Sequence, residues 1–521
     1  MNVAENILKE GRAEAPAVLS EDVTLTYGQV RESTQRIASI LLARGHVKGE
    51  RIGIFSENSA FFIAAYLGII RAGLVAVPLQ AELLPQALER IARDAAMAEI
   101  LVSSRFAKRI RLWSPDIPVL TQEKIESLPP PASARFPDIE PRKDLAALMF
   151  TSGSTGAPKG VMITHRNIEC NTRDIIRYMN LLPADRVLVV LPFHYCFALS
   201  LLHTHLMAGG SLVLDNAFKL FPEQTSEQLD RKQCTGFAGV PSVYQILLRK
   251  TRFRELSFPH LRWFQQAGGK LPDACIQELV QSFPGVRFFS MYGQTEATAR
   301  LSYLPPERLG DKLGSIGKGL ASTKLEVLRP DGKPVTPGSE DTGEIVACGD
   351  NIAAGYWNDP AETAAFFKKG RLHTGDIARV DRDGFIFFVE RERDMLKPGG
   401  NRVSAREVEE VIAEISDVVE TAVVAGPHEL LGESIWAYIV LRPGAVIGSK
   451  EIEKHCRKRL PLFKLPDQIR LLNTLPHNSA GKILKSKLRE MTKVGPMSES
   501  AMERFEIASP SVLVNTHEHS I

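Results

Sequence analysis

The feature that most constrains this chain is an alternation of short apolar strands with amphipathic helices in its amino-terminal part. Thr24–Tyr27, Arg51–Phe55 and Leu74–Leu79 have the composition of strands. Between them, Gly28–Gly45 and Ala60–Ala72 carry apolar residues at helical spacing. Repeated β–α–β units of this kind favour an α/β fold with a mostly parallel sheet.

The alternation returns further along the chain and then gives way to hairpins. We expect a strand at Arg186–Pro192, a helix at Phe197–Met207 and a strand at Ser211–Leu214. From about residue 324 to residue 390, short alternating runs are separated by turns such as Asp331-Gly332, a pattern typical of β-hairpins. The sequence therefore predicts a large N-terminal domain, residues 1–391, with parallel-type β/α subdomains and a β-rich subdomain.

A charged stretch at 390–394 marks a further change. Beyond it, helical patterns at Ala405–Ile415 and Lys450–Leu460 flank strand patterns at Thr421–Val424 and Ile435–Leu441. We expect a small α+β domain over 395–493, which is within the usual size of a domain. Residues 494–521 lack periodicity and are expected to form a loose tail. A metal-binding tract at His517 and His519 is the less favoured interpretation of this tail.

Composition excludes several classes of protein. A length of 521 residues favours more than one domain, and a net charge of +3 gives no basis for nucleic-acid binding. The six cysteines form no CxxC pair, so we expect reduced thiols in a cytoplasmic enzyme. The apolar stretches 61–79 and 187–214 are interrupted by Arg, Pro, His or Gly before they reach the roughly 20 residues of a membrane helix. We expect neither a secretory signal nor an integral membrane span.

The sharpest chemical motif is the loop TSGSTGAPKG at 151–160. It lies between the apolar segments Ala146–Phe150 and Val161–Thr164. Glycines let a backbone approach a ligand closely, and the hydroxyls and Lys159 supply donors for phosphate oxygens. The spacing before Lys159 does not fit the GxxxxGK[ST] loop of kinases and ATPases. Phosphate binding is favoured over a flexible linker.

This loop resembles the signature of the AMP-forming adenylate-forming superfamily, which includes acyl-CoA synthetases, luciferase and adenylation domains. Further motifs of that family follow in order: YGQTE at 292–296, GE at 343–344 with GYW at 355–357, LHTGD at 372–376, and PHNSAGK at 476–482. The resemblance extends from about residue 13 to residue 493. Several motifs in the right order are far more specific than any one of them.

The resemblance implies a role for each matching residue. Glu296 is expected to hold Mg²⁺, Thr295 to contact the α-phosphate and Asp376 to bind the ribose. Lys482 is the expected catalytic lysine. The expected nucleotide- and thiol-binding residues are Thr151, Ser152, Gly153, Ser154, Thr155, Gly156, Lys159, Gly268, Gly269, Tyr292, Gly293, Gln294, Asp376, Arg391, Gly399 and Gly400.

One departure from the family pattern and one specificity position qualify the match. The family usually has Asp or Lys as the hinge two residues after the arginine that Arg391 matches, but this chain has Arg393 followed by Asp394. The hinge is therefore expected within 391–394 without a single assigned residue. His194 occupies a position that the resemblance places beside the substrate carboxylate, although a core histidine is the alternative. No Asp occurs in 192–198, which favours a plain organic acid over an amino acid.

The implied activity is acid–thiol ligation. ATP and a carboxylic acid would give an acyl-adenylate and pyrophosphate, and the acyl group would then move to coenzyme A or to the phosphopantetheine of an acyl or peptidyl carrier protein. A stand-alone amino-acid adenylation enzyme that loads a carrier protein remains the alternative. A kinase or ATPase and a catalytically inactive binding module are the alternatives from other classes. The basic residues Lys454, Arg457, Lys458, Arg459 and Lys464 suggest contact with CoA phosphates or an acidic carrier, or merely a solvated helix face.

Overall fold

The computed structural model describes residues 1–21, 23–113, 116–129, 135–152, 158–391, 395–398, 403–428, 432–478 and 481–493. The chain divides into two compact units. The larger comprises residues 1–392 with 479–482, and the smaller comprises residues 393–478 with 483–521. The predicted hinge residues Arg393 and Asp394, the tail from residue 494, and most of the 151–160 loop lie outside the described residues.

A six-stranded sheet is the first layer of the larger unit, in the order β6-β5-β3-β4-β7-β8. Its strands are β3 (Arg51–Phe55), β4 (Val75–Leu79), β5 (Met97–Val102), β6 (Val119–Thr121), β7 (Leu145–Ser152) and β8 (Pro158–Thr164). All neighbours pair in parallel except β7 and β8, which form an antiparallel hairpin. The helices of this part are α2 (Tyr27–Ala43), α3 (Ala60–Arg71), α4 (Pro85–Asp94), α5 (Ser104–Trp113), α6 (Gln122–Ser127) and α7 (His165–Met179).

A nine-stranded sheet follows, in the order β15-β14-β13-β12-β11-β9-β10-β1-β2. Its strands are β1 (Pro16–Leu19), β2 (Thr24–Thr26), β9 (Arg186–Val189), β10 (Ser211–Leu214), β11 (Gly236–Gly239), β12 (Trp263–Gln266), β13 (Arg287–Tyr292), β14 (Ser302–Leu304) and β15 (Lys318–Gly319). The accompanying helices are α1 (Val3–Lys9), α8 (Cys196–Met207), α9 (Pro222–Arg231), α10 (Pro241–Lys250), α11 (Asp273–Ser282), and the 3₁₀ turns η1 (Phe253–Glu255), η2 (Thr295–Ala297) and η3 (Pro306–Arg308). The strands from β13 through β9 to β1 are parallel, whereas β2, β14 and β15 pair antiparallel at the two ends.

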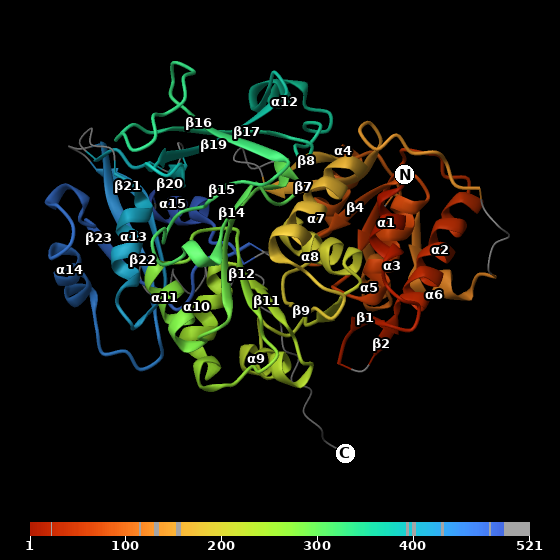
Figure 1. The fold of residues 1–521 in the computed structure, drawn as a ribbon, viewed down its shortest axis with the longest axis horizontal. Helices are drawn as coiled ribbons and strands as arrows, with labels where there is room; N and C mark the ends of the chain where they lie inside the picture. Colours follow the sequence, from red (N-terminus) through yellow and green to blue (C-terminus); the bar gives the residue numbers. More distant parts are fainter. Residues whose placement is uncertain are drawn as a thin grey trace. The chain divides into compact units, whose positions relative to one another are not determined.

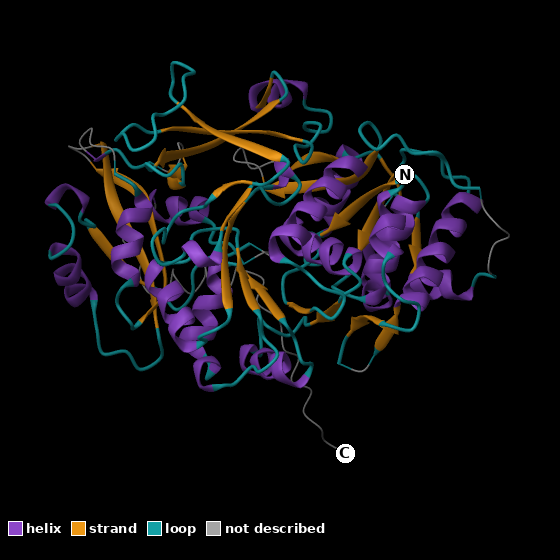
Figure 2. Cartoon of the chain, viewed as in Figure 1, coloured by secondary structure: helices purple, strands orange, loops and turns teal. Residues whose placement is uncertain are grey.

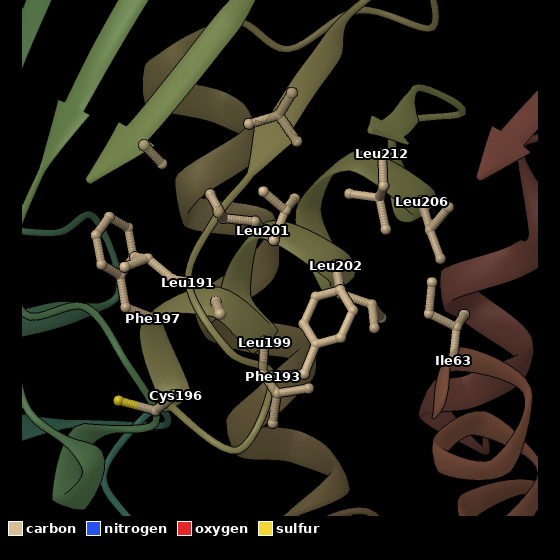
Figure 3. Close-up of a cluster of buried hydrophobic side chains, with 14 of the residues drawn as sticks. Ile63, Leu191, Phe193, Cys196, Phe197, Leu199, Leu201, Leu202, Leu206 and Leu212 are labelled. Atoms are coloured by element: carbon tan, nitrogen blue, oxygen red, sulfur yellow. The ribbon is translucent and has the colours of Figure 1, made fainter. Parts of the chain in front are cut away.

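Helix α8 forms the centre of the larger unit. All twelve of its residues are buried. Its polar members Ser200, His203, Thr204 and His205 each make a hydrogen bond inside the core. Leu202 and Leu206 share a core cluster with Ile63 of α3, and Figure 3 shows these side chains together with Leu212 of β10. Because α8 is fixed on all sides, the residues at its amino-terminal end occupy a rigid position.

The β-rich subdomain of the larger unit is a twisted antiparallel sheet, visible as long arrows in Figure 2. It contains β16 (Thr323–Leu328), β17 (Gly343–Gly349), β18 (Phe367–Lys368), β19 (Arg371–Val380) and β20 (Ile386–Arg391), with helix α12 (Pro360–Phe366). Its position in the chain, between η3 and the end of the larger unit, is shown by the green-to-cyan colours of Figure 1.

The smaller unit is a three-stranded sheet with helices on both faces. It contains α13 (Ala405–Ala413), β21 (Val418–His428), β22 (Gly432–Leu441), α14 (Ser449–Arg457), η6 (Leu462–Lys464), β23 (Gln468–Leu471) and α15 (Lys485–Lys493). Successive residues of a strand face opposite sides. Val423 packs in a cluster with Val408 of α13 and Ile452 of α14, whereas Val424 packs with Leu488 of α15.

The predicted fold class, α/β with a large N-terminal part and a smaller C-terminal domain, is confirmed. Several element bounds differ: the predicted strand Arg186–Pro192 ends at Val189, and the predicted strand Thr421–Val424 extends over Val418–His428. The predicted strand Thr24–Tyr27 ends at Thr26, because Thr26 caps α2: its side chain accepts from the Gln29 amide at 3.4 Å, while its own amide donates to the Gln29 side chain at 2.9 Å. The strands on either side of α2, β2 and β3, belong to different sheets. Within the described ranges, no helix is both long and apolar enough to cross a bilayer.

Candidate active site

Four loops, three of which carry predicted site residues, leave the same edge of the nine-stranded sheet. They follow the carboxyl ends of the neighbouring parallel strands β9, β11, β12 and β13. Ligands of open α/β sheets bind beyond such carboxyl ends. The segments brought together in this way are 190–196, 240–242, 267–269 and 293–296.

The end of β13 meets the β-rich subdomain at a buried carboxylate. Asp376 of β19 has a side chain that is 1% exposed, and it accepts a hydrogen bond from the Tyr292 hydroxyl at 2.6 Å. Arg391 lies directly opposite Asp376 on β20 and donates from Nε at 2.9 Å. Burial, and then the Asp376 carboxylate, hold the pKa of Tyr292 well above its usual range, so the phenol remains a donor. The predicted residues Tyr292, Asp376 and Arg391 are therefore in direct contact.

Glu296 is held by residues that follow β17. Its Oε1 accepts from the Tyr356 hydroxyl at 2.8 Å, and its backbone carbonyl accepts from the Ala353 amide at 2.9 Å. Burial and the Glu296 carboxylate both raise the pKa of Tyr356, which keeps this hydroxyl protonated. Gly293 allows the tight path before Glu296, since a Cβ there would lie 1.9 Å from the Ala299 carbonyl oxygen.

The strands of the β7–β8 hairpin carry Thr151 and Lys159 opposite each other. Lys159 does not point freely toward a ligand. Its Nζ lies 2.7 Å from Glu362 of α12 and 5.6 Å from the centre of the Tyr356 ring. The main chain of Ser152 ends β7. The predicted phosphate-binding residues Gly153, Ser154, Thr155 and Gly156 and the predicted thiol-site glycines Gly399 and Gly400 lie outside the described residues.

Lys482 belongs to the larger unit together with the loops after β9 and β12. Its Nζ lies 5.4 Å from the centre of the Tyr195 ring, and the preceding Gly481 carbonyl accepts from Ser242 Oγ at 2.7 Å. Gly268 has a φ of +90°, and a Cβ there would lie 2.8 Å from the Tyr195 hydroxyl and 3.2 Å from Lys482 Cε. Only glycine fits this point without strain.

The remaining predicted residues surround this group. Thr295 donates to Cys196 Sγ at 3.4 Å, at the first residue of α8. The Gly269 carbonyl accepts from Gln266 Nε2 at 2.7 Å. Gln294 has a buried Nε2 with no hydrogen-bond partner among the described residues, so this donor is oriented without a protein acceptor. Such an unsatisfied buried donor suits a polar ligand.

His194 is in a different electrostatic environment. Burial lowers its pKa to about 4, and the charges that act on it are Glu82 and Lys219. The imidazole is therefore neutral near pH 7 and can exchange hydrogen bonds without contributing a positive charge. The structure records no hydrogen bond from a described residue that links His194 to Thr295 or Glu296.

Sequence reasoning missed a buried cation beneath the site. Arg300 is 1% exposed, donates to the Tyr178 hydroxyl at 2.5 Å and stacks 5.4 Å over the Phe197 ring. Its Nε has no hydrogen-bond partner among the described residues. Burial raises the pKa of the Cys196 thiol, and the hydrogen bond from Thr295 and the charges of Lys482 and Arg300 oppose this rise only in part. The sequence signal that could have identified Arg300 is the presence of an arginine four residues after Glu296, inside an otherwise uncharged run.

No cluster of three or more His, Cys, Asp and Glu residues in the described ranges could hold a metal ion by itself. Glu296 supplies a single half-buried carboxylate, which fits a cation that completes its shell with phosphate oxygens and water, as Mg²⁺ does. The six cysteines are free thiols, five of them buried.

Comparison with known proteins identifies the family. The model of the AMP-binding enzyme family matches residues 6–357, and that of the AMP-binding enzyme C-terminal domain matches residues 407–482. A feruloyl-CoA synthase of Amycolatopsis sp is 30% identical over 91% of this chain and 95% of its own length. The long-chain-fatty-acid–CoA ligase FadD13 of Mycobacterium tuberculosis is 30% identical over 92% of this chain and 95% of its own.

A solved structure agrees with these relatives. The anthranilate CoA ligase AuaEII, in complex with anthranoyl-AMP, superposes with a TM-score of 0.87 at 26% identity and covers 95% of this chain and 98% of its own. The two family models together cover parts of both compact units, and each relative aligns with more than nine-tenths of the chain. The chain therefore belongs to the AMP-binding enzyme family and is an AMP-forming acyl-CoA synthetase.

Proposed function

We propose that this enzyme joins ATP to a carboxylic acid, forms an acyl-adenylate with release of pyrophosphate, and transfers the acyl group to the thiol of coenzyme A. The observation that carries this proposal is the convergence of Lys482, Thr295 and Tyr292 on loops at one edge of the sheet. These residues combine a cation, a hydroxyl and an aromatic ring where an acyl-phosphate linkage needs charge neutralisation and orientation.

Asp376 is the proposed ribose-binding residue. It accepts two hydrogen bonds within the protein, from Tyr292 and Arg391. A carboxylate offers about four lone-pair positions, so acceptor capacity remains for ribose hydroxyls. The Arg391 guanidinium compensates the negative charge of the buried Asp376 carboxylate and orients it. Gln294, with its unsatisfied amide nitrogen, is the proposed donor to a polar group of the nucleotide.

Glu296 is the proposed protein ligand of Mg²⁺, and a bound Mg²⁺ would neutralise charge on the phosphate oxygens. The Tyr356 hydroxyl fixes one Glu296 oxygen at 2.8 Å and thereby orients the carboxylate. Lys159 is the proposed phosphate ligand of the 151–160 loop. Its ion pair with Glu362 must then open, because one ammonium cannot face both a carboxylate and a phosphate at full strength.

For the second step we propose rotation of the C-terminal domain, residues 395–493, about a hinge within residues 391–394. Lys482 groups with the larger unit in this structure, so the proposed movement would detach it from that unit and present Gly399 and Gly400 to the incoming thiol. Hinges of a few residues at the end of an element are a common device for such movement. Arg391 ends β20 and pairs with Asp376 on β19 of the larger unit, which supports β20 as the fixed side of the proposed hinge.

Coenzyme A is favoured over a carrier protein as the acceptor. The relatives described above are named for ligation to CoA, so loading of a carrier protein by an amino-acid adenylation enzyme is not retained. The basic residues proposed for carrier contact are also partly neutralised. Arg457 pairs with Glu453, Arg459 with Glu414 and Lys464 with Glu407.

Which carboxylic acid is the substrate can be tested directly by measuring pyrophosphate release from ATP. The panel should contain ferulate, anthranilate, a long-chain fatty acid and several amino acids, because the relatives differ in the acids they are named for. We expect AMP and pyrophosphate with at least one organic acid, and thioester formation when CoA is added. Production of ADP, or activity only with a carrier protein, would contradict the proposal.

A further inference from the structure

We propose that the surface around the 81–84 loop binds the enzyme to anionic membranes. Four large apolar side chains are exposed there: Leu84 at 68%, Leu112 at 76%, Leu220 at 62% and Phe221 at 51%. Exposed apolar residues scattered singly need no explanation, but a group rimmed by cations marks an interaction site. Together with Arg105 and Lys108, we call these six residues the membrane patch.

Printed contacts hold the parts of this patch together. Arg109 of α5 donates to the carbonyls of Ala81 at 2.9 Å and Leu83 at 2.7 Å, which joins α5 to the loop. Lys219 lies 3.6 Å from Glu82, which joins the segment before α9 to the same loop. The exposed apolar residues therefore come from three segments that converge on residues 81–84.

Helix α5 supplies the charge. Its ten residues include Arg105, Lys108, Arg109 and Arg111 and no acidic residue. Residues three, four and seven positions apart share one face of a helix. Arg105, Lys108 and Leu112 therefore lie on the same face of α5 as Arg109, whose side chain reaches the 81–84 loop. Ala107 and Ile110 form the buried face of α5. The outer face is left with cations and a leucine.

Nearby acidic groups offset only part of this charge. Glu82 acts on Arg109 and pairs with Lys219, and Glu123 acts on Arg111. Arg105 and Lys108 have no ion pair with a described residue. Cations beside exposed leucines match an anionic bilayer, where the charges face lipid headgroups and the apolar side chains enter the acyl boundary. A protein partner would need a complementary acidic and apolar surface, so the bilayer is the simpler occupant.

The location of the patch has a functional consequence. Glu82 and Lys219 lie next to patch residues in the chain, and they are the charges that act on His194, two residues before α8. The membrane patch therefore adjoins the segment 190–196 that leads to Lys482 and Thr295. An apolar acid dissolved in a bilayer would be released on the side of the enzyme that carries this segment.

Vesicle flotation of the full chain tests the proposal without ATP or acid, so its result is independent of the catalytic assignment. The vesicles are pure phosphatidylcholine, or phosphatidylcholine with phosphatidylglycerol. We expect binding to the anionic vesicles, weakened when NaCl is raised. Each cation near an anionic surface is worth about fivefold in partitioning, so Arg105→Gln with Lys108→Gln should lower it about 25-fold.

Matched variants separate this surface from general charge. Lys333→Gln with Lys369→Gln removes two exposed cations of the β-rich subdomain and should leave partitioning unchanged within about twofold. Leu84→Gln with Leu112→Gln should lower binding to anionic vesicles, whereas Val446→Gln, at a residue that is 98% exposed, should not. Absence of vesicle binding, equal losses in both charge variants, or binding only to an acidic protein would each overturn the proposal.

Discussion

Replacing Gly268 by alanine tests whether the loop after β12 positions the candidate catalytic lysine. Gly268 has a φ of +90°, and Tyr195 and Lys482 lie close to the position that a Cβ would occupy. An added Cβ would lie 2.8 Å from the Tyr195 hydroxyl, whereas ordinary contacts lie between 3.4 and 4 Å. Because Val240 stands 3.0 Å away on another side, the methyl group has no open direction into which it can move.

The Gly268→Ala substitution has two separable effects, a backbone cost in folding free energy and a steric conflict in the active site. A residue with a Cβ at positive φ costs about 1–2 kcal/mol of folding free energy. The steric conflict requires Tyr195 or Lys482 to move by about half an ångström. Since a 1 Å misplacement in an active site can cost about 10²-fold in rate, we expect adenylation to fall about tenfold.

Gly285 provides the matched control. It has a φ of +95° and nothing within 4 Å of an added Cβ, so Gly285→Ala carries the backbone cost without the contact. Urea unfolding should show similar destabilisation of both variants, while acid-dependent ATP–pyrophosphate exchange should be impaired only in Gly268→Ala. Normal exchange in Gly268→Ala, or equal loss in Gly285→Ala, would refute the role assigned to this contact.

Three further substitutions address the site and the core. Lys482→Ala should lower adenylation by about 10²–10³ while thioester formation from supplied acyl-adenylate persists, and equal damage to both half-reactions would count against the role of Lys482. Tyr356→Phe removes the donor to Glu296, so the Mg²⁺ concentration for half-maximal pyrophosphate exchange should rise about tenfold; an unchanged Mg²⁺ titration would show that this hydroxyl does not orient the carboxylate. His165, buried and with its pKa lowered by burial from 6.5 to about 4, is neutral in the folded state. The unfolded chain therefore takes up the proton first as pH falls below 6.5, and stability is lost. Urea unfolding at pH 7 and pH 5 should show a loss of about 2 kcal/mol from this group, absent in His165→Gln.

Local sequence patterns were sufficient to predict the helices and strands, but they could not predict which strands share a sheet. The predicted helix Ala60–Ala72 and strand Arg51–Phe55 match α3 and β3 within one residue. The pattern could not show that β2 pairs with β1, beside β10, in the nine-stranded sheet, while β3 begins the other sheet. Which distant strands pair depends on the burial of α3 and α8 between layers. A short window of sequence does not show which elements bury these helices.

The candidate site was predictable as an ordered set of motifs, and its contacts were not. The motif LHTGD named Asp376, but the opposition of Asp376 and Arg391 depends on the register of β19 and β20. The motif around 355–357 contained Tyr356 without indicating that its hydroxyl holds Glu296. Lys159 was assigned to phosphate from its loop alone. Its pairing with Glu362, about two hundred residues later, arises only because α12 packs near β8.

A more general rule would have located the site from strand order. Val189, Gly239, Gln266 and Tyr292 each end one of four adjacent parallel strands, so the residues that follow them must emerge at one edge of the sheet. That rule needs only the strand sequence and predicts the neighbourhood of Tyr195, Ser242 and Gly268, which motif matching left without partners. The family motifs specify which atoms react, and the parallel sheet explains why those atoms meet. A substitution that leaves every motif intact but shifts one of these strand ends should therefore damage adenylation as much as the loss of a motif residue.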